Sequence, residues 1–251
     1  MARNTYGLDL GSYEIKVYDK KQDTIWKEKN VLAVQDKKEI IAIGEDAYQM
    51  YEKTPPDIEV AFPMRDGVIS RFNDMQNLLQ NILKKNRHFS RGAEYVIAVP
   101  TDVTEVQKKA FFDLVIHSNA KAREVNIVER SIADAVGLGI DVQNTTGVMI
   151  INFGGETTEL SVLTEGGIVF NRLLKLGGTT LDQEIVNLVR NSHDFLIGSR
   201  TAEILRQQFD VFNGDSETAF SVAGRDLITG LPMRKTISIT LVRAAFKDTL
   251  L

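Results

Sequence analysis

Two glycine turns are the parts of this sequence best suited to chemistry. The first is Asp9-Leu10-Gly11-Ser12 and the second is Gly154-Gly155-Glu156-Thr157. A glycine turn between two strands presents backbone N–H groups to an anion, and the Ser12 hydroxyl adds a donor at the first turn. Asp9, directly before that turn, is suitably placed to hold a hydrated Mg²⁺ ion that bridges phosphates. If the two turns face each other across a cleft, they predict a site that clamps a nucleotide from both sides.

Alternating apolar residues on both sides of each turn predict the strands that hold it. Residues 5–18 form a hairpin pattern about the first turn and residues 147–162 about the second, with a third strand expected over 168–176. Asp9-Leu10-Gly11-Ser12 and Asn152-Phe153-Gly154-Gly155 occupy equivalent places in the two hairpins. This correspondence indicates two related lobes, with two unrelated glycine turns as the alternative.

Helical and extended segments alternate through the rest of the chain. Apolar residues at three-to-four spacing predict a helix over 68–85, and Thr104 with Gln107 forms a capping box for the next helix. Thr180 with Gln183 is expected to cap a further helix in the same way. The remaining predicted elements are strands at 95–99, 125–128, 219–223 and 236–240, helices at 131–138 and 201–209, and a last helical stretch up to residue 251.

This order of elements predicts the fold class. A group of strands followed by crossover helices occurs twice along the chain. This pattern indicates an α/β fold in two lobes, with mixed sheets and flanking helices. We expect the first lobe to span residues 1–142, with an insertion subdomain at about 31–66, and the second to span 143–251, with a subdomain at about 179–240.

Composition narrows the function classes. The chain has 251 residues, 43% of them apolar and 25% charged, and a net charge of −4, so a folded protein without a nucleic-acid partner is expected. The absence of Cys excludes thiolate catalysis and disulfides, and three scattered His do not suggest a metal cluster. No apolar stretch reaches the eighteen or so residues of a membrane-spanning helix, and the first residues lack the apolar region of a signal peptide. We therefore expect a cytoplasmic protein.

Several longer segments resemble the actin-like ATPases, and within them the MreB-type bacterial actins of the rod shape-determining protein family. The resemblance runs nearly end to end. It rests on residues 7–12, 62–69, 122–133, 151–159, 176–178, 197–203 and 224–232. It implies the two-lobed actin-like ATPase (ribonuclease H-like) fold and a filament-forming role. It also implies that the chain stops before the C-terminal Gly-rich loop and final helix of that fold, so that the C-terminal part of the fold is missing.

The same resemblance implies ATP or ADP with Mg²⁺ as the ligand. Asp9 and Asn152 would hold the metal through water. The nucleotide-binding residues would be Asp9, Gly11, Ser12, Tyr13, Glu14, Lys16, Gly154, Gly155, Glu156, Thr157, Gly177, Gly178, Glu203 and Arg206. For Lys16 the alternative is a solvent-facing strand residue, and for Glu203 with Arg206 it is a solvated pair on an exposed helix.

Three positions depart from the family's pattern. Arg130 stands where the family has a water-activating glutamate, Asn152 where it has a metal-binding aspartate, and Glu156 where it has a third glycine near the phosphates. A guanidinium stays protonated and cannot act as a base. No catalytic residue is therefore intact, and we expect weak or absent ATP hydrolysis. We also expect Arg130 and Glu156 to pair across the phosphate end of the cleft.

The resulting hypothesis is a degenerate MreB-like filament or scaffold protein that acts in bacterial cell shape and in positioning cell-wall synthesis. Its partners would be itself or related bacterial actins as filaments, the cell-wall synthesis machinery and, through Phe89 in the loop 86–92, the inner membrane surface. An ordinary surface loop is the alternative for residues 86–92. An active actin-fold ATPase or a small-molecule kinase is the alternative function.

Overall fold

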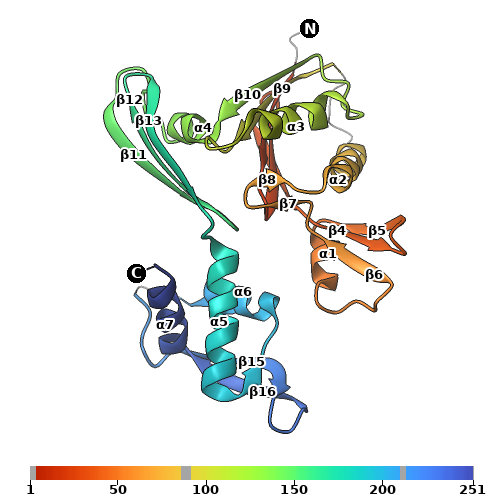
Figure 1. Ribbon diagram of the computed structural model, residues 1–251, viewed down its shortest axis with the longest axis vertical. Helices are drawn as coiled ribbons and strands as arrows, with labels where there is room; N and C mark the ends of the chain where they lie inside the picture. The colour runs from red at the N-terminus through yellow and green to blue at the C-terminus, as the bar shows by residue number, and fades with distance from the viewer. Residues whose placement is uncertain (1–3, 86–91, 210–212, 251) are drawn as a thin grey trace. The chain divides into compact units, whose positions relative to one another are not determined.

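Residues 4–85, 92–209 and 213–250 are described by the computed structural model of the chain. The chain divides into two units, Met1–Lys175 and Leu176–Leu251, both drawn in Figure 1. This division falls later than the predicted lobe boundary near residue 142, because the second glycine hairpin packs within the first unit. The assignment of two related lobes stays a prediction.

The first unit is built on a five-stranded sheet ordered β10-β9-β1-β2-β3. Its strands are β1 (Thr5–Leu10), β2 (Glu14–Asp19), β3 (Thr24–Lys29), β9 (Glu94–Val99) and β10 (Glu124–Glu129). β1, β2 and β3 form antiparallel pairs, whereas β9 runs parallel to both β1 and β10. The predicted hairpin about the first glycine turn is confirmed.

The core of the first unit lies on one face of this sheet. Tyr6, Leu8 and Leu10, which alternate along β1, are buried there together with Leu78 of helix α2 (Phe72–Lys85) and Phe111 of helix α3 (Glu105–Ile116). Figure 1 shows α3 beside β9 and β10, which it contacts. Because successive side chains of a strand point to opposite faces, the pattern of β1 places Asp9 on the face away from this core.

The start of α2 differs from the prediction. Val68 and Ile69 form the short strand β8 and pair with β7 (Met64–Arg65), and the helix begins only at Phe72. Asp66 and Gly67 between these strands have positive φ angles of 51° and 81°. An Asp-Gly pair in this conformation is a favoured two-residue hairpin turn, and it overrides the helical spacing of the apolar residues that follow.

Smaller elements complete the first unit. The segment predicted as an insertion folds into the sheet β5-β4-β6 and a short helix, with a small core of its own. Helix α4 follows β10 and leads to an antiparallel three-stranded sheet that carries the second glycine turn. The bounds are β4 (Leu32–Gln35), β5 (Glu39–Ile43), α1 (Glu45–Met50), β6 (Ile58–Ala61), α4 (Arg130–Gly137), β11 (Thr146–Phe153), β12 (Thr158–Thr164) and β13 (Gly167–Leu174).

The second unit packs three helices with a three-stranded sheet. Its elements are α5 (Gly178–His193), β14 (Phe195–Leu196), α6 (Ser199–Gln208), β15 (Ala219–Asp226), β16 (Pro232–Ser238) and α7 (Ile239–Leu250). The predicted capping by Thr180 and Gln183 is wrong, because α5 begins two residues before Thr180. The Thr180 hydroxyl instead accepts a hydrogen bond from the Gly177 N–H at 3.4 Å, inside the first turn of the helix.

One core residue of the first unit carries an unfavourable polar group. The Tyr95 ring stacks on Tyr6 at 5.4 Å between centroids, and its hydroxyl finds no hydrogen-bond partner among the described residues. Burial raises the pKa of this hydroxyl. We expect Tyr95→Phe to stabilise the unit by about 1 kcal/mol, because it removes a desolvated donor and keeps the ring. Urea unfolding followed by the fluorescence of Trp26 measures this change.

The control for that measurement is Tyr18→Phe on the exposed side of β2. It removes a hydroxyl that donates to Asp23 at 2.9 Å in contact with solvent, so we expect a change within about 0.5 kcal/mol. A loss of stability in Tyr95→Phe would contradict the prediction.

Candidate functional site

The two glycine turns share one backbone geometry. The Gly11 N–H donates to the Glu14 carbonyl at 3.1 Å, and the Gly154 N–H donates to the Thr157 carbonyl at 2.8 Å. A Cβ added to either glycine would lie 2.9 Å from that carbonyl oxygen, which is too close for any other residue type. The correspondence between the two hairpins in the sequence is therefore also a correspondence in structure.

These two turns lie against each other within the first unit. A Cβ on Gly155 would lie 2.5 Å from the Cβ of Tyr13, so this glycine permits their close approach. A third segment joins them, since the Gly67 N–H donates to Ser12 Oγ at 3.1 Å. They surround a pocket of about 240 Å³ that is lined by Asp9, Gly11, Ser12, Tyr13, Glu14, Lys16, Gly67, Arg130, Asn152, Phe153, Gly154, Gly155, Glu156 and Thr157. Every nucleotide-binding residue predicted from the two turns is in this lining.

Asp9 lies between two cations in this pocket. It is the direct cross-strand partner of Lys16, whose Nζ lies 2.9 Å from Asp9 Oδ2. Arg130, the first residue of α4, places Nη2 3.5 Å from Asp9 Oδ1. The ammonium of Lys16 thus takes part in the site, and the alternative of a purely solvent-facing strand residue does not describe it.

Two other carboxylates in the lining are held by neighbours. Glu156 Oε2 accepts the Asp66 backbone N–H at 2.7 Å, and Glu14 Oε1 lies 3.9 Å from Lys27 Nζ. The expected pair between Arg130 and Glu156 is therefore wrong. The turn of the β7–β8 hairpin supplies a backbone donor that captures Glu156, and Arg130 faces Asp9 instead.

The residues predicted to hold Mg²⁺ fit that ion poorly. Both carboxylate oxygens of Asp9 already face cations, and the Asn152 side-chain N–H₂ donates to Asp134 Oδ2 at 2.7 Å. Mg²⁺ in proteins prefers one or two available carboxylates in an octahedral shell. Among the described residues, no group of three or more His, Cys, Asp or Glu side chains is arranged to hold a metal. The metal assignment to Asp9 and Asn152 stays a prediction, and these contacts count against it.

Sequence reasoning missed two carboxylates beside the pocket. Asp134 lies one helical turn after Arg130 and binds Asn152; burial raises its pKa, against the opposing effects of the Asn152 hydrogen bond and the Arg130 charge. Glu159 is only 3% exposed, and its Oε1 accepts from the Thr101 N–H and from Asn171. Since Thr101 lies 58 positions away along the chain, no local pattern could have indicated this network.

The remaining predicted nucleotide contacts belong to the second unit. Arg206 makes two hydrogen bonds to Asp182, at 2.6 and 3.2 Å, and a Cβ on Gly178 would lie 3.1 Å from Arg206 Nη2. Glu203 is 5% exposed and accepts from Gln207 at 3.0 Å. A solvated pair of Glu203 and Arg206 on an exposed helix is therefore wrong. Gly177 precedes α5 beside this cluster.

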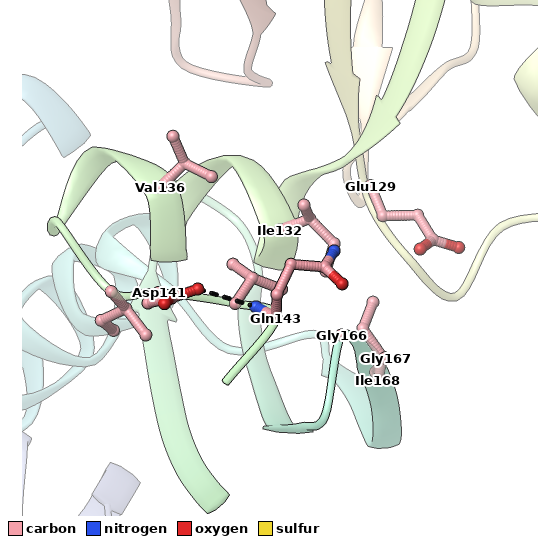
Figure 2. A pocket seen from close by; sticks show the side chains of 10 residues that line it. Glu129, Ile132, Val136, Asp141, Gln143, Gly166, Gly167 and Ile168 are labelled. Carbon is pink, nitrogen blue, oxygen red and sulfur yellow. Dashed lines mark hydrogen bonds between the residues drawn. The ribbon is translucent and has the colours of Figure 1, made fainter. Parts of the chain in front are cut away.

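A second pocket in the first unit has a different character (Figure 2). Its volume is about 490 Å³, and it is lined by Glu129, Ile132, Val136, Ile140, Asp141, Val142, Gln143, Gly166, Gly167 and Ile168. Figure 2 shows a hydrogen bond in the loop between α4 and β11, where the Gln143 backbone N–H donates to Asp141 Oδ1 at 3.1 Å. Two acidic side chains and no Lys or Arg stand in this described lining, so it does not suit phosphate.

Phe89, the predicted membrane contact, lies outside the described residues. Within the described ranges, no helix has both the length and the apolar character needed to cross a membrane.

Comparison with known proteins identifies relatives over the whole chain. The family model for MreB/Mbl protein matches residues 3–251. Cell shape-determining protein MreB of Escherichia coli (strain K12) is 33% identical over 259 residues, which cover 100% of this chain and 74% of the relative. Cell shape-determining protein Mbl of Bacillus subtilis (strain 168) is 30% identical over 247 residues, which cover 96% of this chain and 73% of the relative.

Solved structures agree with these relatives. The crystal structure of MreB 5 of Spiroplasma citri bound to AMPPNP is 30% identical and superimposes with a TM-score of 0.92, covering 100% of this chain and 76% of that chain. The same protein bound to ADP gives a TM-score of 0.91. A MamK double helical filament, at 20% identity and a TM-score of 0.77, shares the fold. The predicted actin-like fold is thus confirmed.

Proposed function

The chain belongs to the MreB/Mbl family, and from this premise we propose that it binds an adenine nucleotide and assembles into filaments that act in bacterial cell shape. The observation that carries the proposal is the pocket between the two glycine turns, with Lys16 and Arg130 in its lining and both facing Asp9. Backbone N–H groups of such turns and two cations are complementary to a chain of phosphates. The proposed ligand is ATP or ADP, in keeping with the nucleotides bound to MreB 5 of Spiroplasma citri.

Assembly is the second part of the proposal. Head-to-tail contacts that do not close generate filaments, either of this chain alone or together with related bacterial actins. The curated relatives are cell shape-determining proteins, so we place the filament at the cytoplasmic side of the cell envelope, as a scaffold that positions the cell-wall synthesis machinery. The pocket would then control assembly through the nucleotide that it holds.

Sedimentation with and without nucleotide tests this function. We expect ATP or AMPPNP to increase the pelleted fraction of the chain. Lys16→Ala is expected to weaken nucleotide binding about 10- to 100-fold, because it removes one charge-assisted contact, and so to lose the nucleotide-dependent increase. Lys20→Ala is the matched control, since Lys20 is exposed directly after β2 and lies outside the pocket lining.

Two results would contradict the proposal. If AMPPNP does not bind, the pocket is not a nucleotide site. If ATP binds without any change in sedimentation, while ADP and a phosphorylated product form when a small-molecule acceptor is added, the kinase alternative is favoured over the filament.

A further inference from the structure

We infer that Lys16 and Arg130 take the place of a divalent cation in this pocket, so that the site binds the phosphates of its nucleotide without Mg²⁺. The inference rests on the proposed nucleotide binding and adds to it the identity of the counter-charge. Its basis is that Lys16 and Arg130 both face Asp9, the carboxylate predicted to hold the metal.

The charge of the two side chains equals that of the ion they would replace. One ammonium and one guanidinium together carry two positive charges, as Mg²⁺ does, and they face the two oxygens of Asp9 separately. A divalent ion at Asp9 would have to displace both or lie beside them, and repulsion between like charges opposes this. Asn152 adds no charge, and its amide N–H₂ is directed to Asp134.

Arg130 has a donor without a hydrogen-bond partner in the described part of the chain. Its side chain is 12% exposed, and Nη2 is buried without a hydrogen-bond partner among the described residues, although it lies near Asp9. A guanidinium carries five N–H donors and stays charged at any physiological pH. Leaving such a donor unsatisfied is costly, so a phosphate oxygen in the pocket would satisfy it.

Lys16 has the freedom that a ligand contact requires. Its side chain is 44% exposed and lines the pocket. The backbone of Lys16 is held in β2, and the ammonium at the end of the side chain can contact a ligand. Lysine is a compact charge on a flexible stem with three donors. It can therefore keep one hydrogen bond to Asp9 while it donates to a phosphate.

Where the charges lie in the pocket determines whether it can bind phosphate, more than their sum does. The lining contains three carboxylates and two cations. The carboxylate of Glu156 accepts a hydrogen bond from the Asp66 backbone N–H. The carboxylate of Glu14 lies near the ammonium of Lys27, a residue that is not part of the lining. Lys16 and Arg130 thus remain with Asp9 beside the N–H groups of the two turns, and this is where a phosphate would bind.

The test compares binding of AMPPNP to the whole chain in excess MgCl₂ and in excess EDTA at equal ionic strength, by calorimetry. We expect the two Kd values to agree within about threefold. Lys16→Met and Arg130→Met are expected to weaken binding about 10- to 100-fold in both buffers. Lys20→Met, at an exposed lysine outside the pocket lining, is expected to change it less than about twofold. Arg130→Glu with Asn152→Asp, which supplies two carboxylates, is expected to make binding depend on MgCl₂.

Each outcome of the comparison has one meaning. Equal affinity in MgCl₂ and EDTA supports the inference, and it is measured on the wild-type chain, so it does not depend on whether any variant folds. Binding that is more than about threefold tighter in MgCl₂ overturns the inference and leaves the proposed nucleotide site intact. Absence of binding in both buffers overturns the nucleotide site and the inference with it.

Discussion

The triple variant Arg130→Glu, Asn152→Asp, Glu156→Gly is expected to release phosphate from ATP about 10²- to 10⁴-fold faster than the wild-type chain. This range corresponds to about 3–5 kcal/mol of activation free energy, the usual contribution of a general base. The resemblance to the MreB-type actins implies a water-activating glutamate at the position of Arg130. A guanidinium cannot accept the proton that an attacking water loses.

Arg130 does more than leave the site without a base, because its charge also interacts with neighbouring carboxylates. Arg130 Nη2 lies 3.5 Å from Asp9, and its charge also acts on Asp134 one turn later in α4. Arg130→Glu alone would place a third carboxylate among these residues. We therefore expect the single variant to bind nucleotide poorly, and restoration requires Asn152→Asp together with MgCl₂ in the assay.

Glu156→Gly is the control within the set. It removes a carboxylate that accepts the Asp66 N–H and introduces the third glycine that the resemblance implies for this turn, but it supplies no base. We expect this single variant to leave phosphate release at the wild-type rate. If the wild-type chain already releases phosphate as fast as the triple variant, Arg130 does not disable the site.

Local patterns predicted the elements that carry the site. Apolar alternation gave the hairpin 5–18, and the register Leu10 with Ile15 then makes Asp9 the partner of Lys16. The sequence also indicated that the glycines form the two turns. The structure gives the reason for this residue type, because a Cβ at Gly11 or Gly154 would come too close to a backbone carbonyl oxygen. One local signal was misjudged, since Asp66-Gly67 directs a hairpin where apolar spacing suggested a helix.

The tertiary partners of the charged residues could not be predicted in this way. Arg130 was recognised as a departure from the family's pattern, yet its acidic neighbour is Asp9 and not Glu156. Glu156 is taken by a backbone N–H that lies 90 positions earlier in the chain. Which of several carboxylates a cation meets depends on how the sheets pack, and sequence spacing carries no information about that.

Gly155→Ala is expected to have the largest effect on nucleotide binding of any single methyl group added to the chain. The new Cβ would lie 2.5 Å from Tyr13 Cβ, so the two turns must move apart by about 1 Å, and a displacement of that size in a binding site typically costs about 10²-fold. Overpacking of this kind also destabilises a fold by about 1–3 kcal/mol. Calorimetric titration with AMPPNP and urea unfolding followed by Trp26 measure the two effects.

Gly137→Ala is the matched control, because Gly137 ends α4 in open space with nothing within 4 Å of an added Cβ. It is expected to leave affinity unchanged and to stabilise the helix by up to about 1 kcal/mol. Tyr13→Gly in the Gly155→Ala background removes the opposing Cβ and is expected to recover part of the lost affinity. A double-mutant cycle then isolates the contact between the turns. Additive effects of the two substitutions would show that the turns do not meet at these residues, and the shared phosphate pocket would be disproved with them.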